Sequence, residues 1–323
     1  MAEHLGAAAD GPDGADGTDA GTFPGGAVLR RGSTGWVLAE ERPERALGGA
    51  LVWAARSHIE QLHVLAEGEE AAGVLARRAA AFRRPPQVWT ISGRTVTPAV
   101  PAPPLSEEPP TDAHLAFAAM FAAAGAEAVV EHGVLVAEVL GLEVGRVIDG
   151  RLDVGVGKHD REAQRLVHVD RPPEEALRAA VAAVREVRRA GAPVHEMNRL
   201  AHERWLRSVV MASPQMVGAA SLAPLPEPVS RQGLRMAAPA PAAGLDADGR
   251  PLVVVCSTGI DVDLVPTAAD ARLGHDPTAR LVIVVPEADD HPVTRDLAAQ
   301  LADPAEVVAI TGDWRDLPVP ASR

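Results

Sequence analysis

Apolar positions along residues 34–98 recur at two alternating spacings. Short apolar runs predict β-strands, and stretches that place Leu and Ala at helical spacing predict helices between them. The predicted strands are residues 36–39, 61–66 and 88–91, and the predicted helices are residues 44–57 and 69–82. Strands that alternate with helices of this length indicate a parallel sheet, so we expect a small Rossmann-like α/β unit over residues 34–98.

The same alternation returns toward the end of the chain. Residues 252–256 and 281–285 are continuous apolar runs, as expected of strands buried in a parallel sheet. A third strand is predicted at residues 307–310, with helices at residues 264–273 and 291–301. We therefore expect a second Rossmann-like unit over residues 250–323.

A β-hairpin is predicted between these two units. Residues 134–148 are rich in Val, Leu and Ile, and Asp149-Gly150 is a strong signal for a two-residue hairpin loop. Pairing residues 144–148 with residues 152–156 would place Glu143 across from Gly157, beside Lys158. Because side chains two apart on a strand share a face, Val156 and Lys158 would lie on the same side.

Helices are predicted on both sides of the hairpin, at residues 111–124, 174–190 and 193–211. Together these elements form a central α/β module over residues 112–212. The predicted fold is thus α/β, with Rossmann-like units flanking a central α/β module that contains a β-hairpin.

Three segments have the composition of tails or linkers. Residues 1–33 are rich in Gly, Ala and Asp and predict a disordered tail. Residues 99–111 form a proline-rich linker that should be stiff and extended. Residues 213–249 are rich in Pro, Ala and Gly, and we expect a long linker with little structure of its own.

Composition narrows the class of protein. The 323 residues carry a formal net charge of −13, which argues against tight non-specific binding to DNA. A single cysteine, Cys256, fits a reducing cytosol. The sequence contains neither an apolar run of membrane-spanning length nor a secretory signal. We expect a cytoplasmic protein without a membrane partner, and its composition resembles that of actinobacterial proteins.

One candidate basic surface is present on the helices after the hairpin. Their arginines alternate with glutamates, which also fits a solvated, salt-bridged helix face. The arginines concerned are Arg178, Arg185, Arg188, Arg189, Arg199, Arg204 and Arg207.

The segments Leu142-Glu143-Val144, Asp149-Gly150-Arg151-Leu152 and Val156-Gly157-Lys158 follow one another in an order that resembles the PD-(D/E)XK nuclease superfamily, and the resemblance covers about residues 112–166. Leu142-Glu143-Val144 resembles the strand with that family's first acid, and Val156-Gly157-Lys158 stands in the place of its acid-x-Lys pair. The resemblance implies that Glu143 and Lys158 are catalytic, and that the chain acts on nucleic acid by metal-assisted phosphodiester hydrolysis.

The second acid of that motif is replaced by Val156, so the metal site would be incomplete or atypical. One carboxylate alone should bind Mg²⁺ or Mn²⁺ weakly. A migrated second ligand could come from Asp160 or Glu162 in the following helix, or from Glu131 or Glu138 on neighbouring strands. Glu143 and Glu162 are taken as the candidate metal ligands. A glutamate on an otherwise apolar strand is more often a solvated edge residue than a ligand, and a lysine at a strand end is more often a surface cation, so Glu143 and Lys158 have this second interpretation.

A second candidate site follows the buried strand 252–256. Ligands of open α/β sheets bind beyond the carboxyl ends of the strands, so the loop 256–263 could hold a nucleotide or another small molecule. Its candidate binding residues are Ser257, Thr258, Gly259, Asp261 and Asp263. The same polar residues could instead cap the next helix.

Three functions therefore stay open at this point. The first is a nuclease-like protein that acts on or binds nucleic acid. The second is a non-catalytic binding or scaffold protein that kept the fold without the site. The third is a nucleotide or small-molecule binder that uses the loop 256–263.

Overall fold

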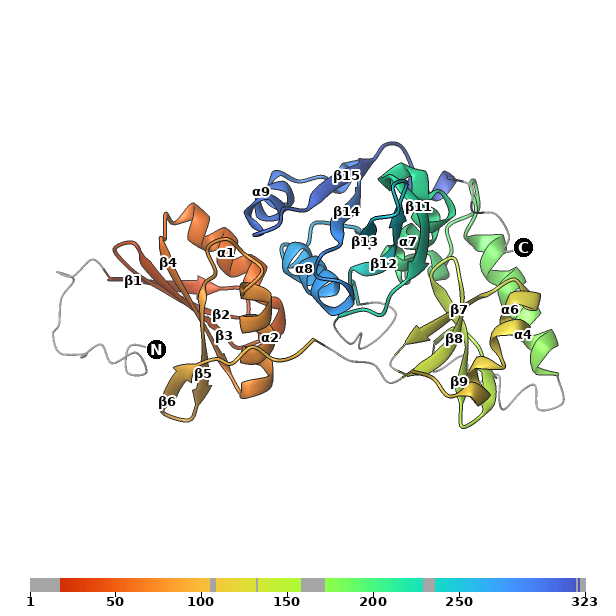
Figure 1. Ribbon diagram of the computed structural model, residues 1–323, viewed down its shortest axis with the longest axis horizontal. Coiled ribbons are helices and arrows are strands. Elements are labelled where there is room, and N and C mark those ends of the chain that lie inside the picture. The colour runs from red at the N-terminus through yellow and green to blue at the C-terminus, as the bar shows by residue number, and fades with distance from the viewer. Residues whose placement is uncertain are drawn as a thin grey trace. The chain divides into compact units, whose positions relative to one another are not determined.

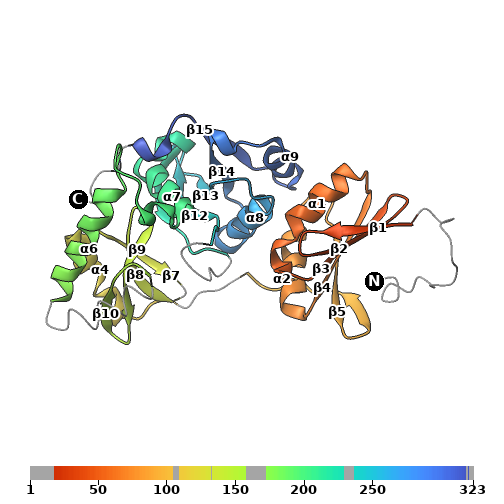
Figure 2. The same ribbon diagram turned by 180° about the vertical axis from the view of Figure 1, so that it is seen from behind.

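The computed structural model describes residues 18–104, 109–131, 133–157, 172–228, 236–317 and 319. Its helices and sheets confirm the α/β class. The chain divides into two compact units (Figures 1 and 2). The first unit comprises Met1–Pro104, Asp261–Leu273 and His291–Glu306, and the second comprises the ranges Leu105–Ile260, Gly274–Asp290 and Val307–Arg323.

This division corrects the predicted domains. Residues 250–323 do not form a unit of their own, because most of α8 and α9 belong with the N-terminal sheet. The reason is visible in the contacts of α8, where the buried Asp270 accepts hydrogen bonds from Arg77 and Arg78 of α2. The bounds of these helices are Glu69–Ala79 for α2, Leu264–His275 for α8 and Pro292–Gln300 for α9.

The first unit contains a six-stranded sheet in the order β1-β2-β3-β4-β5-β6. Strands β3, β4 and β5 are parallel, as predicted, and antiparallel strands flank them. The strands are Thr18–Phe23, Gly26–Arg31, Thr34–Ala39, Gln61–Glu67, Gln87–Ser92 and Thr95–Pro98, and the helix α1 is Leu47–Arg56.

The predicted disordered tail is wrong for residues 18–33, because β1 and β2 form a hairpin there. Phe23 and Val28 are its buried side chains, and Gly25 adopts a positive φ in the turn. A segment in which only Phe23, Val28 and Leu29 are large apolar residues gives a weak strand signal, although β2 pairs with β3 along its whole length.

The second unit contains a four-stranded antiparallel sheet in the order β10-β9-β8-β7. The predicted hairpin at Asp149-Gly150 is present, but its register differs by one residue, since Ile148 pairs with Arg151. The last strand ends at Val154, before Val156. The strands are Glu127–Glu131, Val134–Val139, Leu142–Ile148 and Arg151–Val154, and the helices beside them are α3 (Asp112–Leu115), α4 (Ala118–Ala124) and α6 (Pro173–Val187).

A five-stranded sheet completes the second unit, in the order β11-β12-β13-β14-β15. The parallel pair β13 and β14 corresponds to the two buried strands predicted from sequence. The strands are Ala219–Pro224, Ala240–Asp246, Pro251–Cys256, Arg280–Pro286 and Glu306–Ile310, and the adjoining helix α7 is His202–Ala212.

The predicted linker over residues 213–249 is corrected by β11 and β12, which lie within it. The small residues that give this segment the composition of a linker allow two strands, β11 and β12, to approach closely. A Cβ added at Gly244 would lie 1.8 Å from the carbonyl oxygen of Ser221, so only glycine permits this approach.

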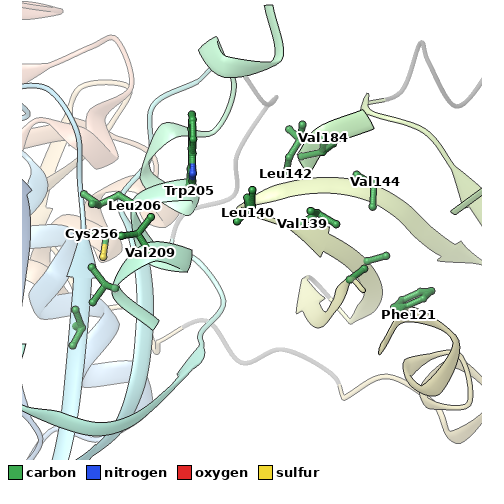
Figure 3. Packing of buried hydrophobic residues seen from close by; sticks show 14 of the residues in the cluster. Phe121, Val139, Leu140, Leu142, Val144, Val184, Trp205, Leu206, Val209 and Cys256 are labelled. Carbon is green, nitrogen blue, oxygen red and sulfur yellow. The ribbon is translucent and has the colours of Figure 1, made fainter. Parts of the chain in front are cut away.

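One hydrophobic core runs through the second unit (Figure 3). Phe121 and Val184 enter it from α4 and α6, Leu142 and Val144 from the four-stranded sheet, and residues of α7 from the other side. Within the described ranges, no helix combines the length and apolar character that crossing a membrane requires.

Candidate functional site

Glu143 lies in a row of carboxylates that crosses three strands of the four-stranded sheet. Glu127 of β7 pairs with Glu138 of β8, and Glu138 pairs with Glu143 of β9. Glu138 and Glu143 are only 1% and 4% exposed. Like charges directly opposite one another on neighbouring strands destabilise a sheet, so this row needs positive partners.

Arg146 is the partner of Glu143. Its Nε donates to Oε1 at 2.9 Å and its Nη2 donates to Oε2 at 2.8 Å, a two-point hydrogen-bonded ion pair. The hydrogen bond to Glu143 is the largest cause that raises the pKa of Arg146 above its ordinary value. Both oxygens of the predicted metal ligand are therefore engaged by a guanidinium of the same strand.

A β-bulge makes this pairing possible. Residues three apart on a regular strand point to opposite faces. Here Glu138 pairs with Glu143, whereas the preceding Ala137 pairs with Gly145, so Val144 is an extra residue on β9. The extra residue returns Arg146 to the face that carries Glu143.

Helix α7 supplies the remaining positive charges. Arg207 Nη2 donates to Glu138 Oε1 at 2.7 Å, and Arg204 Nε donates to Glu227 Oε1 at 2.8 Å. Arg204 also donates to Glu131, which Arg146 contacts from the sheet. We call this set the Glu–Arg network; its members are Glu131, Glu138, Glu143, Glu227, Arg146, Arg204 and Arg207.

The electrostatics of the network follow from burial and charge pairing. Burial lowers the pKa of Arg204, but the carboxylates of Glu227, Glu138 and Glu131 outweigh it and raise the pKa above its ordinary value. Burial is also the largest cause that raises the pKa of Glu127, and the neighbouring Glu138 adds to it. The network is thus an internal charge arrangement that joins α7 to the sheet.

Of the residues predicted to act with Glu143, only the alternative metal ligands lie among the described residues. Lys158 and the second candidate metal ligand, Glu162, lie outside the described residues, as does Asp160. The alternative ligands Glu131 and Glu138 do lie near Glu143, and both contact arginines. In the part of the chain that the structure describes, no group of three or more His, Cys, Asp or Glu side chains could hold a metal ion.

The candidate loop 256–263 is divided between the two units, and its residues up to Ile260 belong to the second. The polar groups of this part have hydrogen-bond partners within the second unit. The Gly259 N–H donates to Asp289 Oδ2 at 2.7 Å, and Thr258 Oγ1 donates to the buried Glu203 at 3.2 Å. The backbone N–H of Ser257 donates to the carbonyl of Val284. A carboxylate of the chain itself occupies the amide that an anionic ligand would need.

The two aspartates of the loop belong to the first unit. Asp261 pairs with Arg45. Asp263 accepts a hydrogen bond from the Gly48 N–H at 3.1 Å and another from Arg78 Nη1 at 3.1 Å. Burial outweighs these contacts and raises the pKa of Asp263 to about 6. Both carboxylates connect the start of α8 to the N-terminal part of the chain.

The predicted basic surface does not form a continuous patch. Arg188, Arg204 and Arg207 are buried, at 3%, 4% and 2% exposure. Two exposed arginines of α6 and its end, Arg178 and Arg189, pair with glutamates three or four residues away. The three buried arginines therefore serve internal contacts.

A cluster of three rings on neighbouring strands of the first unit was missed from the sequence alone. Trp36 of β3 stacks on His63 of β4 with ring centroids 5.4 Å apart, and Trp89 Nε1 of β5 donates to His63 Nδ1 at 3.1 Å. Burial lowers the pKa of His63. Aligning the predicted parallel strands would have placed Trp36 beside His63, whereas Trp89 pairs with Leu65, two residues further along β4. Comparisons of the chain with protein-family models, curated proteins and solved structures found no match.

Proposed function

We propose that this chain is a non-catalytic α/β binding or scaffold protein, in which the acid expected to hold a metal is a structural residue. The observation that carries this proposal is the pair of hydrogen bonds by which Arg146 engages both oxygens of Glu143. This function is the alternative to metal-dependent cleavage of nucleic acid by Glu143 and Lys158.

Metal chemistry makes different demands on such a carboxylate. Mg²⁺ keeps several of its waters and is bound through one or two carboxylates together with substrate phosphates. A carboxylate at 4% exposure offers little room for a hydrated ion. Releasing it from Arg146 would also break a two-point ion pair at a buried carboxylate, which is strongly unfavourable.

Nucleotide binding by the loop 256–263 is less favoured for a related reason. The Gly259 amide that would receive a phosphate oxygen is bonded to Asp289. A phosphate would have to displace this carboxylate, and Glu203 nearby adds a second negative charge through its contact with Thr258.

Isothermal titration with Mg²⁺ and Mn²⁺ tests the proposal, using the wild type, Glu143→Gln and the control Glu174→Gln. Glu174 is exposed on α6 and pairs only loosely with Arg178, at 3.7 Å. We expect no binding tighter than millimolar in any of the three. Metal-dependent cleavage of DNA or RNA that survives in the control and disappears in Glu143→Gln would overturn the proposal in favour of the nuclease.

A further inference from the structure

The two faces of the six-stranded sheet in the first unit differ in what covers them. Helices α1 and α2 lie on one side (Figures 1 and 2). The side chains of β3 confirm which side this is, since a Cβ added at Gly35 would lie 2.7 Å from Trp53 of α1. Gly35, Val37 and Ala39 therefore face the helices.

The alternate positions form an apolar surface on the opposite face. Its rows follow from the strand register: Leu29, Trp36 and His63 form one row. Ala27, Leu38, Leu65 and Trp89 form the next. Most of these side chains are half-buried, and Leu65 is fully buried. We call these seven residues the apolar sheet face.

Among the described residues of the first unit, helices α1 and α2 lie on the other face, so this apolar surface is unusual for a parallel sheet. Parallel strands occur almost only in sheets with both faces covered, whereas sheets with one solvated face alternate apolar and polar side chains. Strands β3, β4 and β5 are parallel and carry apolar side chains on both faces. The apolar sheet face thus has the character of a surface that packs against another layer.

Charged residues at the two ends of the hairpin β2–β3 indicate what packs against the apolar sheet face. Arg31 ends β2 and has the strand parity of Leu29. Glu40 continues the alternation of Trp36 and Leu38 one residue beyond β3, at the opposite end of the hairpin. Both are exposed. An identical hairpin turned end to end would bring each arginine over a glutamate of the other copy.

We propose that the apolar sheet face is the interface of a homodimer, in which two copies pack face to face. The two-fold axis lies between the two sheets, parallel to their planes and perpendicular to the strands. Arg31 of each copy meets Glu40 of the other in this arrangement. The axis makes the contact self-complementary, because the same patch serves both copies. The dimer does not depend on the proposed function, since it uses a different sheet in a different unit.

Sedimentation equilibrium of the full chain over a range of concentrations tests the proposal. Leu38→Glu places a charge in the centre of the interface, and we expect it to be monomeric where the wild type is dimeric. Thr97→Glu is the matched control, because Thr97 is exposed on edge strand β6 with the opposite parity. Far-UV circular dichroism establishes that each variant is folded.

A charge exchange distinguishes this arrangement from other dimers. Arg31→Glu and Glu40→Arg should each raise the dimer dissociation constant about tenfold or more, since like charges then meet. The double variant Arg31→Glu/Glu40→Arg should restore it toward the wild-type value. A wild-type chain that stays monomeric at every concentration, or a double variant weaker than both single ones, would overturn the proposal.

Discussion

Arg146 follows Glu143 by three residues on strand β9, yet it donates two hydrogen bonds, of 2.9 and 2.8 Å, to that carboxylate. The bulge at Val144 brings the two side chains to one face. The pair therefore depends on a local irregularity of the sheet. It also determines the role of Glu143, because both oxygens of its carboxylate are hydrogen-bonded to Arg146. A carboxylate held at both oxygens inside a protein contributes to stability through its partner.

Removing this carboxylate should destabilise the second unit. We expect Glu143→Gln to lower the free energy of unfolding by about 3 kcal/mol, because it breaks the two-point ion pair between a buried carboxylate and Arg146 and leaves Arg146 only its longer contact with Glu131 among the pairs described above. Urea denaturation followed by circular dichroism measures the loss. The control Glu174→Gln removes an exposed pair with Arg178 and should cost only about 0.3 kcal/mol. Equal losses in the two variants would mean that the Glu143 pair is not structural.

Regular periodicity predicted part of this fold well. The parallel strands β13 and β14 and the Asp149-Gly150 hairpin follow from apolar runs and turn chemistry. The Glu143–Arg146 pair could not be predicted in this way, because a spacing of three residues places strand side chains on opposite faces. The extra residue, Val144, can be identified only from the register in which β9 pairs with β8. The positions of Lys158 and Glu162 lie outside the described residues.

The hairpins of the second unit offer a second test. Gly141 and Gly150 occupy equivalent loop positions, with φ of +79° and +72°. A Cβ at Gly141 would lie 2.2 Å from the backbone of Arg204 and Trp205, whereas one at Gly150 would meet nothing within 4 Å. We expect Gly150→Ala to cost about 1 kcal/mol from backbone strain alone. Gly141→Ala should cost more than about 4 kcal/mol, because backbone of α7 would have to move.

Soluble yield and urea denaturation compare the two glycine variants. A Gly141→Ala protein as stable as Gly150→Ala would show that α7 does not pack against the β8–β9 loop as described. That result would also argue against the contacts of the Glu–Arg network, since Arg204 and Arg207 lie on α7.

Cys256 should be inert in the folded protein. Its side chain ends β13 at 0% exposure, and burial raises the pKa of the thiol to about 12. Because the thiolate is the reactive form, we expect no alkylation by iodoacetamide at pH 8 under native conditions and complete alkylation in denaturant. Mass spectrometry of the intact chain detects the adduct. Rapid native labelling would contradict both the burial of β13 and the expectation of an unreactive thiol.

Asp263 should make the folded chain less stable as the pH rises from about 4 to about 7. Its carboxyl group accepts hydrogen bonds from Gly48 and Arg78, yet burial raises its pKa from 3.8 to about 6. Below pH 4 the group is protonated in both the folded and the unfolded chain. Between the two values the unfolded chain loses the proton first, so the stability that neutral Asp263 contributes is lost as the pH rises through about 6.

The variant Asp263→Asn isolates this effect because it removes the titrating group while leaving an oxygen for the Gly48 N–H. The difference between a pKa of 3.8 and one of about 6 corresponds to roughly 3 kcal/mol. We therefore expect the free energy of unfolding of the variant, relative to the wild type, to rise by up to that amount between pH 4 and pH 7. Urea denaturation at both pH values measures it. A relative stability that stays constant would mean that Asp263 is already ionised in the folded chain at pH 4, and that Arg78 outweighs burial.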